Sequence, residues 1–242
     1  PIALGFLIQP PAGPLAPIVV AVVGAFGLAG RSPYDHVSDI EAPLTAADLP
    51  AAREMVGRIV GRDVDRLTEK GVASAALESL AESFNDGLVA PVFWFLVGGL
   101  PGLFAYKAIN TADSMIGHME ERYRLFGWAA ARTDDLMNLI PARIAGGLIT
   151  LAAGRGWKTM LREAGKHASP NAGWPEAAMA GALNVTLGGP VMYDSAVANR
   201  AKLGDGPHPR AADLRRGLTV YLRACALLGA ALILGGLAWS YL

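Results

Sequence analysis

The fold is decided by the stretch YKAINTADSMIGHMEERYRLFGWAAARTDDLMNLIPAR, residues 106–143. This stretch is rich in Asp, Glu, Asn and Arg, whereas apolar runs dominate the sequence on either side of it. Polar groups that a largely apolar chain concentrates in one place are those expected to bind ligands or perform chemistry. The functional site is therefore to be sought in and around these residues.

The composition is that of a membrane protein. Hydrophobic residues make up 52% of the 242 residues and charged residues only 17%, against about a quarter in soluble domains, and the mean hydropathy is +0.34. The formal net charge of zero provides no basic field for nucleic acid, which we exclude as a partner. The single cysteine, Cys225, lies in an apolar run, so neither a disulfide framework nor a cysteine metal site is expected.

Two terminal stretches are expected to enter the membrane. Residues 1–30 carry no charge, but their prolines leave only residues 14–30 as a continuous helix. Crossing a bilayer takes about 20 residues, so this helix is either a short span or a helix buried in protein. Because the chain begins at Pro1 without a methionine, we expect this segment to be truncated. Residues 224–242, which are free of charge and follow three arginines, are the strongest candidate for a transmembrane helix.

A third apolar run, residues 87–106, is long enough to cross but is interrupted. The tetrad GGLP at residues 98–101 should break a helix rather than bend it. The run is therefore either one kinked crossing or a re-entrant pair of half-helices. A fourth run, residues 140–154, is short for a crossing but could enter the membrane with Arg143 at the interface.

The polar segments between these runs predict helices. Residues 44–60 have the apolar spacing of a helix, and a second helix starts near Ser74. On that helix Glu78, Glu82 and Asp86 are four residues apart and share one face. Three acids without an interleaved cation repel one another. This face therefore meets open water, or it receives a metal ion or arginines from elsewhere in the chain.

No alternating β pattern is sustained, so we expect an all-α, multi-pass integral membrane protein whose polar helical loops carry the site. A basic helix at residues 157–167 could lie on an anionic membrane surface. The chain reads as one membrane domain, residues 1–242, divided into a membrane segment at 1–30, polar helices at 31–86, the broken run at 87–106, a motif-rich region at 107–203 and the helix at 224–242.

Acids, amides and arginines recur at helical spacing in the opening stretch. Oxygen ligands of this kind suit Mg²⁺, and arginines suit phosphate and carboxylate groups. The pattern predicts phosphoryl chemistry on anionic substrates, unless these are ordinary surface pairs and caps. Phosphate-binding, dinucleotide-binding and zinc-protease motifs are absent, and the four histidines lack ligand spacing. The residues of the opening stretch that are three or four positions apart, and can therefore share a helix face, are Asn110 with Asp113, Arg132 with Asp135, and Asp134 with Asn138.

The loop SPNAGWPEAA, residues 169–178, combines turn residues with a large aromatic side chain. In it Trp174 offers an apolar plate beside Asn171 and Glu176. Such a loop can bind a planar ligand, or it can be an interfacial tryptophan anchor followed by a helix start.

Four ordered motifs resemble the CobD/CbiB family of cobalamin biosynthesis, whose members are membrane-bound adenosylcobinamide-phosphate synthases. The motifs are ESLAESFNDGLVAPVFW, YKAINTADSMIG, ERYRLFGWAAARTDDLMNLIPAR and SPNAGWPEAAMAGAL. The resemblance covers residues 36–190, and VGRDVDRL at residues 60–67 also fits it. The chain departs from it at Ser83, where members often carry Asn, so an amide role at that position is in doubt.

The resemblance implies ATP-dependent amide formation between adenosylcobyric acid and aminopropanol or its phosphate. ATP would be a co-substrate and Mg²⁺ would neutralise its phosphates. The implied catalytic residues are Asp113, Asp134, Asp135 and Arg143, and the implied metal ligands are Asp134, Asp135, Glu82 and Asp86. The implied substrate-binding residues are Asn110, Arg122, Arg132, Asn138, Asn171, Trp174 and Glu176.

Topology limits how these residues can meet. Glu82 and Asp86 precede residues 87–106 and Asp134 follows them, so a shared site requires the re-entrant hairpin, which we expect. Six of the 21 Lys and Arg residues precede that run and the others follow it, which favours a cytoplasmic second half.

We therefore expect a cell inner-membrane enzyme with its site facing the cytoplasm. Its partners would be the lipid bilayer, the corrinoid and the amine, and other cobalamin-biosynthesis enzymes or a second copy of the chain could also bind it. A non-catalytic membrane scaffold and a corrinoid transporter remain alternatives. A scaffold needs no close polar pairs, and a transporter should carry ionisable residues within its spans.

Overall fold

A computed structural model of the chain describes residues 16–61, 63–117, 124–193, 196–198 and 200–240. These residues are mostly helical, with four short strands. The chain divides into two compact units. The first comprises Pro1–Ala29 and Asn85–Ala142, and the second comprises Gly30–Phe84 and Arg143–Leu242.

The first unit consists of helix α2 (Ala16–Ala25), the π-helix η1 (Asn85–Val89), α6 (Ala90–Ile116) and the first part of α7 (Arg124–Ala153). The segment after α2 packs against the start of this hairpin, where the N–H of Ala29 donates to the carbonyl of Gly87 at 2.9 Å. A Cβ at Gly27 would lie only 2.8 Å from the side chain of Leu103. Glycine there lets the backbone approach α6 closely.

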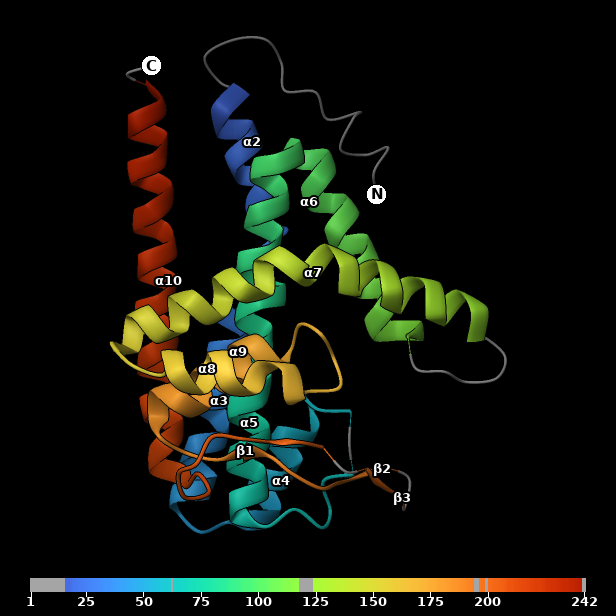
Figure 1. Cartoon of the computed structure of the whole chain (residues 1–242), viewed down its shortest axis with the longest axis vertical. Coiled ribbons are helices and arrows are strands. Elements are labelled where there is room, and N and C mark those ends of the chain that lie inside the picture. The colour runs from blue at the N-terminus through green and yellow to red at the C-terminus, as the bar shows by residue number, and fades with distance from the viewer. Residues whose placement is uncertain (1–15, 62, 118–123, 194–195, 199, 241–242) are drawn as a thin grey trace. The chain divides into compact units, whose positions relative to one another are not determined.

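Helix α6 is a helical hairpin, as expected from the GGLP tetrad. Its backbone leaves helical geometry at Gly98 and at Gly99, where φ is +60° and ψ is −153°, a conformation that favours glycine. A Cβ at Gly102 would overlap the carbonyl oxygen of Trp94, so the two arms meet closely. Figure 1 shows the chain rising and then descending again within α6. At 1.5 Å per residue each apolar arm is roughly 15 Å long, about half of a bilayer core.

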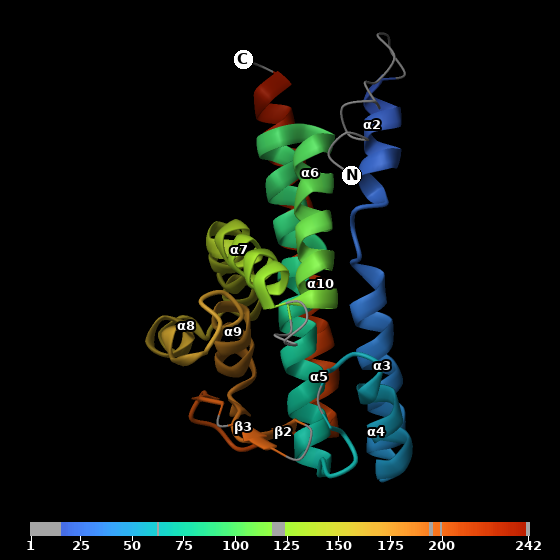
Figure 2. The ribbon, with the colours of Figure 1, turned by 90° about the vertical axis from the view of Figure 1, so that its right-hand side faces the viewer.

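The second unit is built around α5 (Glu69–Phe84). Its sequence is rich in alanine, a strong helix former, and the helix is buried on nearly every side. It packs against α3 (Arg31–Thr45), α9 (Gly173–Leu183) and α10 (Ala211–Ser240), and α5 and α10 run side by side in both views (Figure 1, Figure 2). The core side chains are Ile40 and Leu44 of α3, Leu77, Leu80 and Phe84 of α5, Met179 of α9, and Leu214, Leu218 and Tyr221 of α10.

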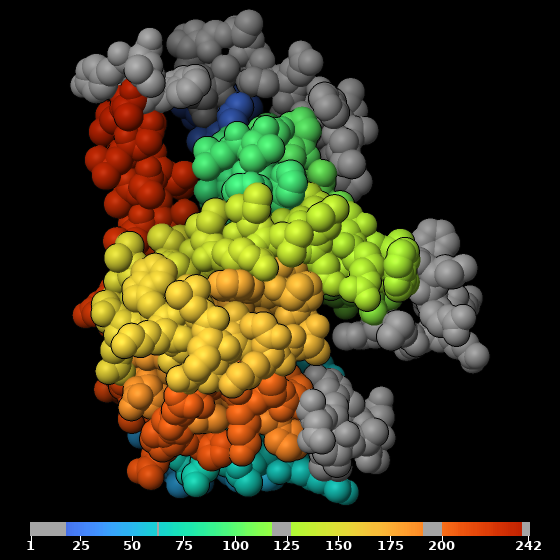
Figure 3. All heavy atoms as spheres, viewed as in Figure 1, coloured from blue at the N-terminus to red at the C-terminus, as the bar shows by residue number. Residues whose placement is uncertain are grey.

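Shorter elements complete this unit. Helix α4 (Leu49–Gly57) is capped by Asp48, whose carboxylate accepts the N–H of Ala51 at 3.1 Å. The helix expected at 44–60 is therefore shorter, because Ala47 turns the chain with a φ of +58°. Helix α8 (Trp157–Glu163) continues into η3 (Ala164–Lys166). On the face shown in Figure 3, α8 and α9 form much of the surface of this unit.

The four strands were not expected. Strand β1 (Leu187–Gly188) pairs with β4 (Lys202–Leu203), and β2 (Val191–Tyr193) pairs with β3 (Ala196–Ala198), both antiparallel. Runs of two or three residues are too short to show an alternating pattern in the sequence.

Three described helical segments are long and apolar enough to cross a membrane, namely Glu69–Ile116, Gly127–Ala153 and Ala211–Ala238. The last includes most of the run at 224–242 that was expected to cross the membrane. The run at 140–154, judged short from the sequence, is the end of a longer helix that continues through Pro141. Helix α2 has 10 residues and is not one of the three. The chain is thus an all-α membrane protein with two short β-ribbons.

Candidate functional site

Six polar side chains of the first unit form one hydrogen-bonded network, here named the acid–amide cluster. The amide nitrogen of Asn85 donates to Asp86 Oδ1 at 2.7 Å and to Asn138 Oδ1 at 2.8 Å. The hydroxyl of Tyr106 lies 3.3 Å and 3.1 Å from the same two oxygens. The amides of Asn110 and Asn138 donate to the two oxygens of Asp134, at 3.2 Å and 2.9 Å. The cluster comprises Asn85, Asp86, Tyr106, Asn110, Asp134 and Asn138.

Each element positions its part of the cluster for a local reason. Asn85 and Asp86 open the π-helix η1, a wider turn that often occurs at functional sites. The reversal of α6 returns Tyr106 to Asp86, which lies 20 residues earlier in the chain. On α7, Asp134 and Asn138 share a face because they are four residues apart.

The acid–amide cluster has a surplus of negative charge and one unsatisfied oxygen. The carboxylates of Asp86 and Asp113 lie close enough to oppose the charge of Asp134. The side-chain oxygen of Asn85 is buried and accepts no hydrogen bond from the described part of the chain, which for an amide oxygen costs about 1–3 kcal/mol. Oxygen atoms gathered around negative charge suit a cation.

Carboxylates alone do not form a metal site here. Across the described ranges, no three His, Cys, Asp or Glu side chains are grouped so that they could hold a metal ion. A metal bound at the acid–amide cluster would therefore need amide oxygens as ligands beside the carboxylates.

The cluster contains only part of the expected site. Asp135 forms an ion pair with Arg132 instead, with 3.4 Å between Oδ2 and Nη1, and the Arg132 side chain is exposed. Asp113 contributes its charge, and Arg122 lies outside the described residues. The expected residues that do lie in the cluster are Asp86, Asn110, Asp134 and Asn138.

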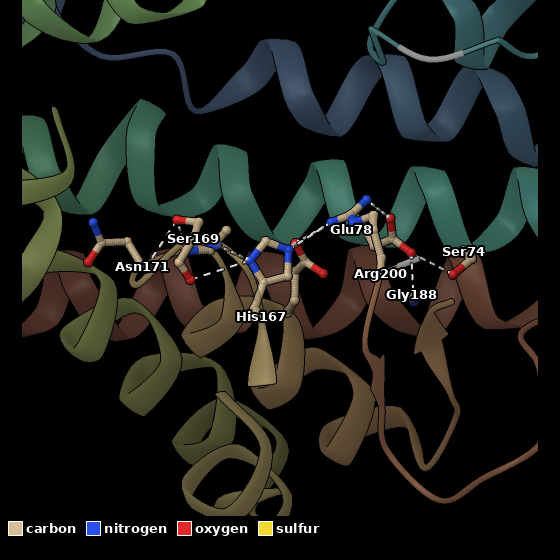
Figure 4. Close-up of polar contacts among 9 residues, drawn as sticks. Ser74, Glu78, His167, Ser169, Asn171, Gly188 and Arg200 are labelled. Atoms are coloured by element: carbon tan, nitrogen blue, oxygen red, sulfur yellow. Dashed lines mark hydrogen bonds and ion pairs between the residues drawn. The ribbon is translucent and has the colours of Figure 1, made fainter. Parts of the chain in front are cut away.

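A second group of polar side chains, in the second unit, converges on Arg200. Its Nη1 donates to Glu78 Oε2 at 3.1 Å, and its Nη2 donates to Glu176 Oε1 at 3.2 Å. Glu78 and Glu176 are 4% and 0% exposed. Figure 4 shows Arg200 between Glu78 and His167, beside α5. The hydroxyl of Ser74 donates to Glu78 Oε1 at 2.7 Å, and Glu82 lies beside Glu176. This Arg200 cluster comprises Ser74, Glu78 and Glu82 of α5, His167, Glu176 of α9, and Arg200 itself.

His167 is held as a neutral ring. Its Nε2 lies 2.9 Å from Arg200 Nη2 and must accept there, because a guanidinium only donates. Its Nδ1 lies 3.0 Å from the backbone nitrogen of Ser169, an N–H donor, and 3.4 Å from the carbonyl oxygen of the same residue. Burial, followed by the charge of Arg200, lowers the pKa of His167 below its usual value.

Two buried carboxylates hold the segment that carries Arg200. The N–H of Gly188 donates to Glu78 Oε1 at 2.9 Å, and the N–H of Gly204 donates to Glu163 Oε2 at 2.6 Å. Burial by itself would raise the pKa of Glu163, but the hydrogen bond from Gly204 and the neighbouring cation Arg162 bring it below its usual value. Gly188 and Gly204, which lie before and after Arg200 in the chain, are thereby each bonded to a glutamate side chain of a helix.

The acidic face predicted for α5 is explained in part by an arginine from elsewhere. Glu78 meets Arg200, 122 residues later in the chain. Glu82 also belongs to the second unit, where it lies beside Glu176, whereas Asp86 belongs to the first unit. The expected metal candidates thus fall in two units, Glu82 in the second and Asp86, Asp134 and Asp135 in the first.

The remaining candidates lie around α9. Trp174 is in the first turn of this helix rather than in a loop, and the guanidinium of Arg143 lies 4.6 Å from its ring centroid, a cation–π contact. Asn171 is 6% exposed, and its backbone N–H donates to Ser169 Oγ at 3.2 Å. One face of the Trp174 ring, which was expected to meet a planar ligand, is therefore occupied by Arg143.

Sequence reasoning missed several cluster members. Asn85 and Tyr106 lie inside the quoted motifs, so the sequence could have indicated that they belong to the site. It could not have indicated the hydrogen bonds that they form there. His167 and Arg200 carry no local signal, because Arg200 meets partners 24 to 122 residues away.

Comparison with known proteins gives one consistent result. Residues 2–221 match the model of the family described as CobD/Cbib protein. The chain is 54% identical over 245 residues to "Cobalamin biosynthesis protein CobD" of Rhodobacter capsulatus, covering 99% of this chain and 77% of that protein. It is 54% identical over 195 residues to the protein so named of Brucella suis, covering 77% and 60%. For that of Rhizobium meliloti the identity is 47% over 227 residues, covering 89% and 69%. No solved structure matches it.

Proposed function

The chain belongs to the CobD/Cbib protein family, and from this premise we propose that it acts in cobalamin biosynthesis as an ATP-dependent, amide-forming ligase. The acid would be adenosylcobyric acid and the amine aminopropanol or its phosphate. The product would be adenosylcobinamide or its phosphate. Since ATP is cytoplasmic, the site would face the cytoplasm from the cell inner membrane.

The chemistry explains which groups are needed. A carboxylate is a poor electrophile, so its oxygen first attacks the γ-phosphorus of ATP, forming an acyl phosphate and releasing ADP. The amine nitrogen then attacks the acyl carbon, inorganic phosphate leaves, and the nitrogen loses a proton. Mg²⁺, when bound with ATP, neutralises phosphate charge. The protein must hold the carboxylate and the amine together and stabilise the charge that develops on oxygen.

The observation that carries the proposal is the acid–amide cluster. Two of the motifs that characterise the resemblance, YKAINTADSMIG and RTDDLMNLIPAR, meet in it through the hydrogen bond between Asn110 and Asp134. Asp113, Asp134 and Asp135 would serve the ion and the phosphates. Arg143 and Arg132 would hold phosphate or carboxylate groups.

The test is ATP consumption by the purified full-length protein in nanodiscs. We expect ADP and amide to form in equal amounts only when corrinoid acid and amino alcohol are both present. Asp134→Asn should lower kcat at least about 100-fold, as expected when charge stabilisation in the transition state is lost.

The two alternative functions, a membrane scaffold and a corrinoid transporter, predict different results in the same preparation. A scaffold would consume no ATP under any substrate combination. A transporter would move corrinoid into proteoliposomes without forming amide. Either result would overturn the ligase proposal.

A further inference from the structure

The part of α7 that belongs to the second unit and helix α8 share one exposed apolar surface. Ile144 and Leu151 of α7 are 40% and 57% exposed, and they share a helix face because they are seven residues apart. Gly147 lies between them on that face, and a Cβ built on it would lie 3.9 Å from the ring of Trp157. Trp157 and Leu161, four residues apart on α8, are 43% and 67% exposed. These five residues form a continuous surface, here named the α7–α8 face.

The opposite sides of both helices are packed against the protein. On α7, Ala145 and Ile149 are buried, and a Cβ built on Gly146 would lie 2.8 Å from the sulfur of Met160 on α8. On α8, Met160 and Glu163 are buried. Both helices are therefore fixed by packing, with the α7–α8 face directed outward. Figure 3 shows α8 at the surface of the molecule.

The exposed charges beside the α7–α8 face are basic. Arg155 and Lys158 are exposed, and the side chains of Arg162 and Lys166 are 52% and 51% exposed. The one acidic residue in the sequence from 143 to 166, Glu163, is 2% exposed.

Pairing removes only part of this positive charge. Arg162 forms ion pairs with Glu163 and with Asp205. Arg155 donates to the backbone carbonyl of Ala182 at 2.7 Å, which carries no net charge. The surroundings of the α7–α8 face are thus complementary to the phosphate groups of anionic lipids.

Charge also limits how α7 can enter a membrane. Residues 144–154 carry no charge, but Arg143 precedes them and Arg155 follows them. A helix of that length extends about 17 Å, against roughly 30 Å for the hydrocarbon core. The hydropathy of Gly127–Ala153 would let that longer segment cross, but Arg143 would then lie about 5 Å from the middle of the span, where a cation is costly. The second half of α7 therefore suits a position parallel to the membrane surface.

We propose that the α7–α8 face lies at the boundary between headgroups and acyl chains and binds anionic phospholipid there. Ile144, Leu151 and Leu161 enter the outer acyl region, where amphipathic helices insert to about 5–10 Å. Trp157 lies at headgroup level, as tryptophan commonly does, and Lys158 meets lipid phosphate. The sequence indicated only a basic helix, whereas the structure adds the apolar surface and the contribution of α7.

A bilayer rather than another protein is the occupant because of α10. This helix belongs to the same unit and contains a segment, Ala211–Ala238, that is long and apolar enough to cross a membrane. Lipid is therefore always within reach of the unit that carries the α7–α8 face. The inference does not depend on the ligase reaction.

The depth of single nitroxide labels tests this position in the full-length protein, reconstituted in nanodiscs rich in phosphatidylglycerol. With Cys225 replaced by alanine, the labels are attached to Ile144→Cys, Leu151→Cys and Leu161→Cys, one at a time. Electron paramagnetic resonance compares their collisions with oxygen, which concentrates in lipid, and with a water-soluble nickel complex. We expect all three labels at similar depths, about 5–10 Å below the phosphates. Glu54→Cys, exposed on α4 of the same unit, is the control and should report water.

Lipid charge is tested with a fluorophore on Leu161→Cys. Quenching by nitroxide-labelled phosphatidylglycerol, compared with nitroxide-labelled phosphatidylcholine, gives the preference for anionic lipid. Lys158→Gln should lower this preference about fivefold, which is the contribution of one basic residue near an anionic surface. Arg58→Gln removes an exposed cation from α4 and should leave the preference unchanged.

Four results would overturn the inference. Labels that behave like the one on Glu54→Cys would show that the face meets water, and labels shielded from both oxygen and nickel would show that a protein covers it. Depths of Ile144→Cys and Leu151→Cys that differ by about 10 Å, the rise of seven helical residues, would show that α7 crosses. Equal quenching by the two lipids would exclude a preference for anionic headgroups.

Discussion

Arg200 joins two buried carboxylates from different helices. It contacts Glu78 of α5 at 3.1 Å and Glu176 of α9 at 3.2 Å, and its own side chain is only 20% exposed. Removing one partner of a buried ion pair costs about 3–5 kcal/mol, because charge is left in a medium that solvates it poorly. The residue therefore matters to the stability of the second unit, whatever else it does.

Replacing Arg200 by methionine should lower the free energy of unfolding by about 3–5 kcal/mol. Methionine fills a similar volume, so the loss would report charge rather than packing. The matched control is Arg58→Ala, which removes an exposed pair with Glu54 and should change stability by less than about 0.5 kcal/mol. Thermal unfolding in detergent compares the two, and equal shifts would contradict this account.

The pH dependence of stability should carry a signature of His167. Burial and the charge of Arg200 lower its pKa, and the carboxylates of Glu82 and Glu78 oppose this more weakly. Between the lowered value and the unfolded value of about 6.5, the unfolded chain binds more protons than the folded one. Stability is thus greatest above about pH 6.5 and falls as the pH drops through the folded pKa.

His167→Gln should flatten this part of the profile, because glutamine does not titrate. The measurement is the unfolding temperature at several pH values from 7.5 to 5. His208→Gln, on an exposed part of the chain, serves as the control and should keep the natural slope. A natural slope in His167→Gln would show that another group causes the pH dependence.

At the scale of elements, the hairpin within α6 determines which residues can meet. Its reversal at Gly98 and Gly99 brings Tyr106 within 3.3 Å of Asp86. A straight helix would carry residues 20 positions apart to points about 30 Å apart. The break therefore creates the acid–amide cluster.

Gly102→Ala should destabilise the hairpin by about 1–3 kcal/mol, since its Cβ would overlap the carbonyl oxygen of Trp94. Gly98→Ala is the control, because a Cβ there meets nothing within 4 Å. Thermal unfolding of both variants measures the difference. A Gly102→Ala protein as stable as Gly98→Ala would mean that the arms are not in close contact.

Cysteine labelling tests whether the hairpin is re-entrant. With Cys225 replaced by alanine, cysteines placed singly at Ser83 and Ser114 should react with a membrane-impermeant maleimide from the same side of the membrane. Labelling from opposite sides would show that the chain crosses completely between them.

At the scale of the whole molecule, α10 connects protein packing to lipid. Leu214, Leu218 and Tyr221 near its start are buried in the second unit, whereas Ile233 and Leu234 are 65% and 66% exposed. Exposed aliphatic side chains on a helix long enough to cross a membrane are expected to face acyl chains.

A lysine at Ile233 should therefore disfavour membrane insertion of α10 by about 2.5–3.5 kcal/mol. Thr219→Lys, at an exposed position of the same helix that is closer to its arginines, should insert normally. Glycosylation mapping in microsomes reports the inserted fraction. Equal insertion of both variants would place Ile233 away from the hydrocarbon core.

The sequence by itself determined the membrane character, the C-terminal helix and the broken run, because each depends on local hydropathy or on glycine and proline. It also placed Asp134 with Asn138, since residues four apart share a helix face whatever surrounds them.

Only the tertiary structure decided which polar groups meet. Glu78 and Arg200 are 122 residues apart, and the acidic residues that looked like one stripe belong to two units. Asp134 and Asp135 looked equivalent in the opening stretch, yet one lies in the acid–amide cluster and the other pairs with Arg132. Adjacent residues on a helix point about 100° apart, so the neighbours of each were set by the packing of other elements, which local sequence does not encode.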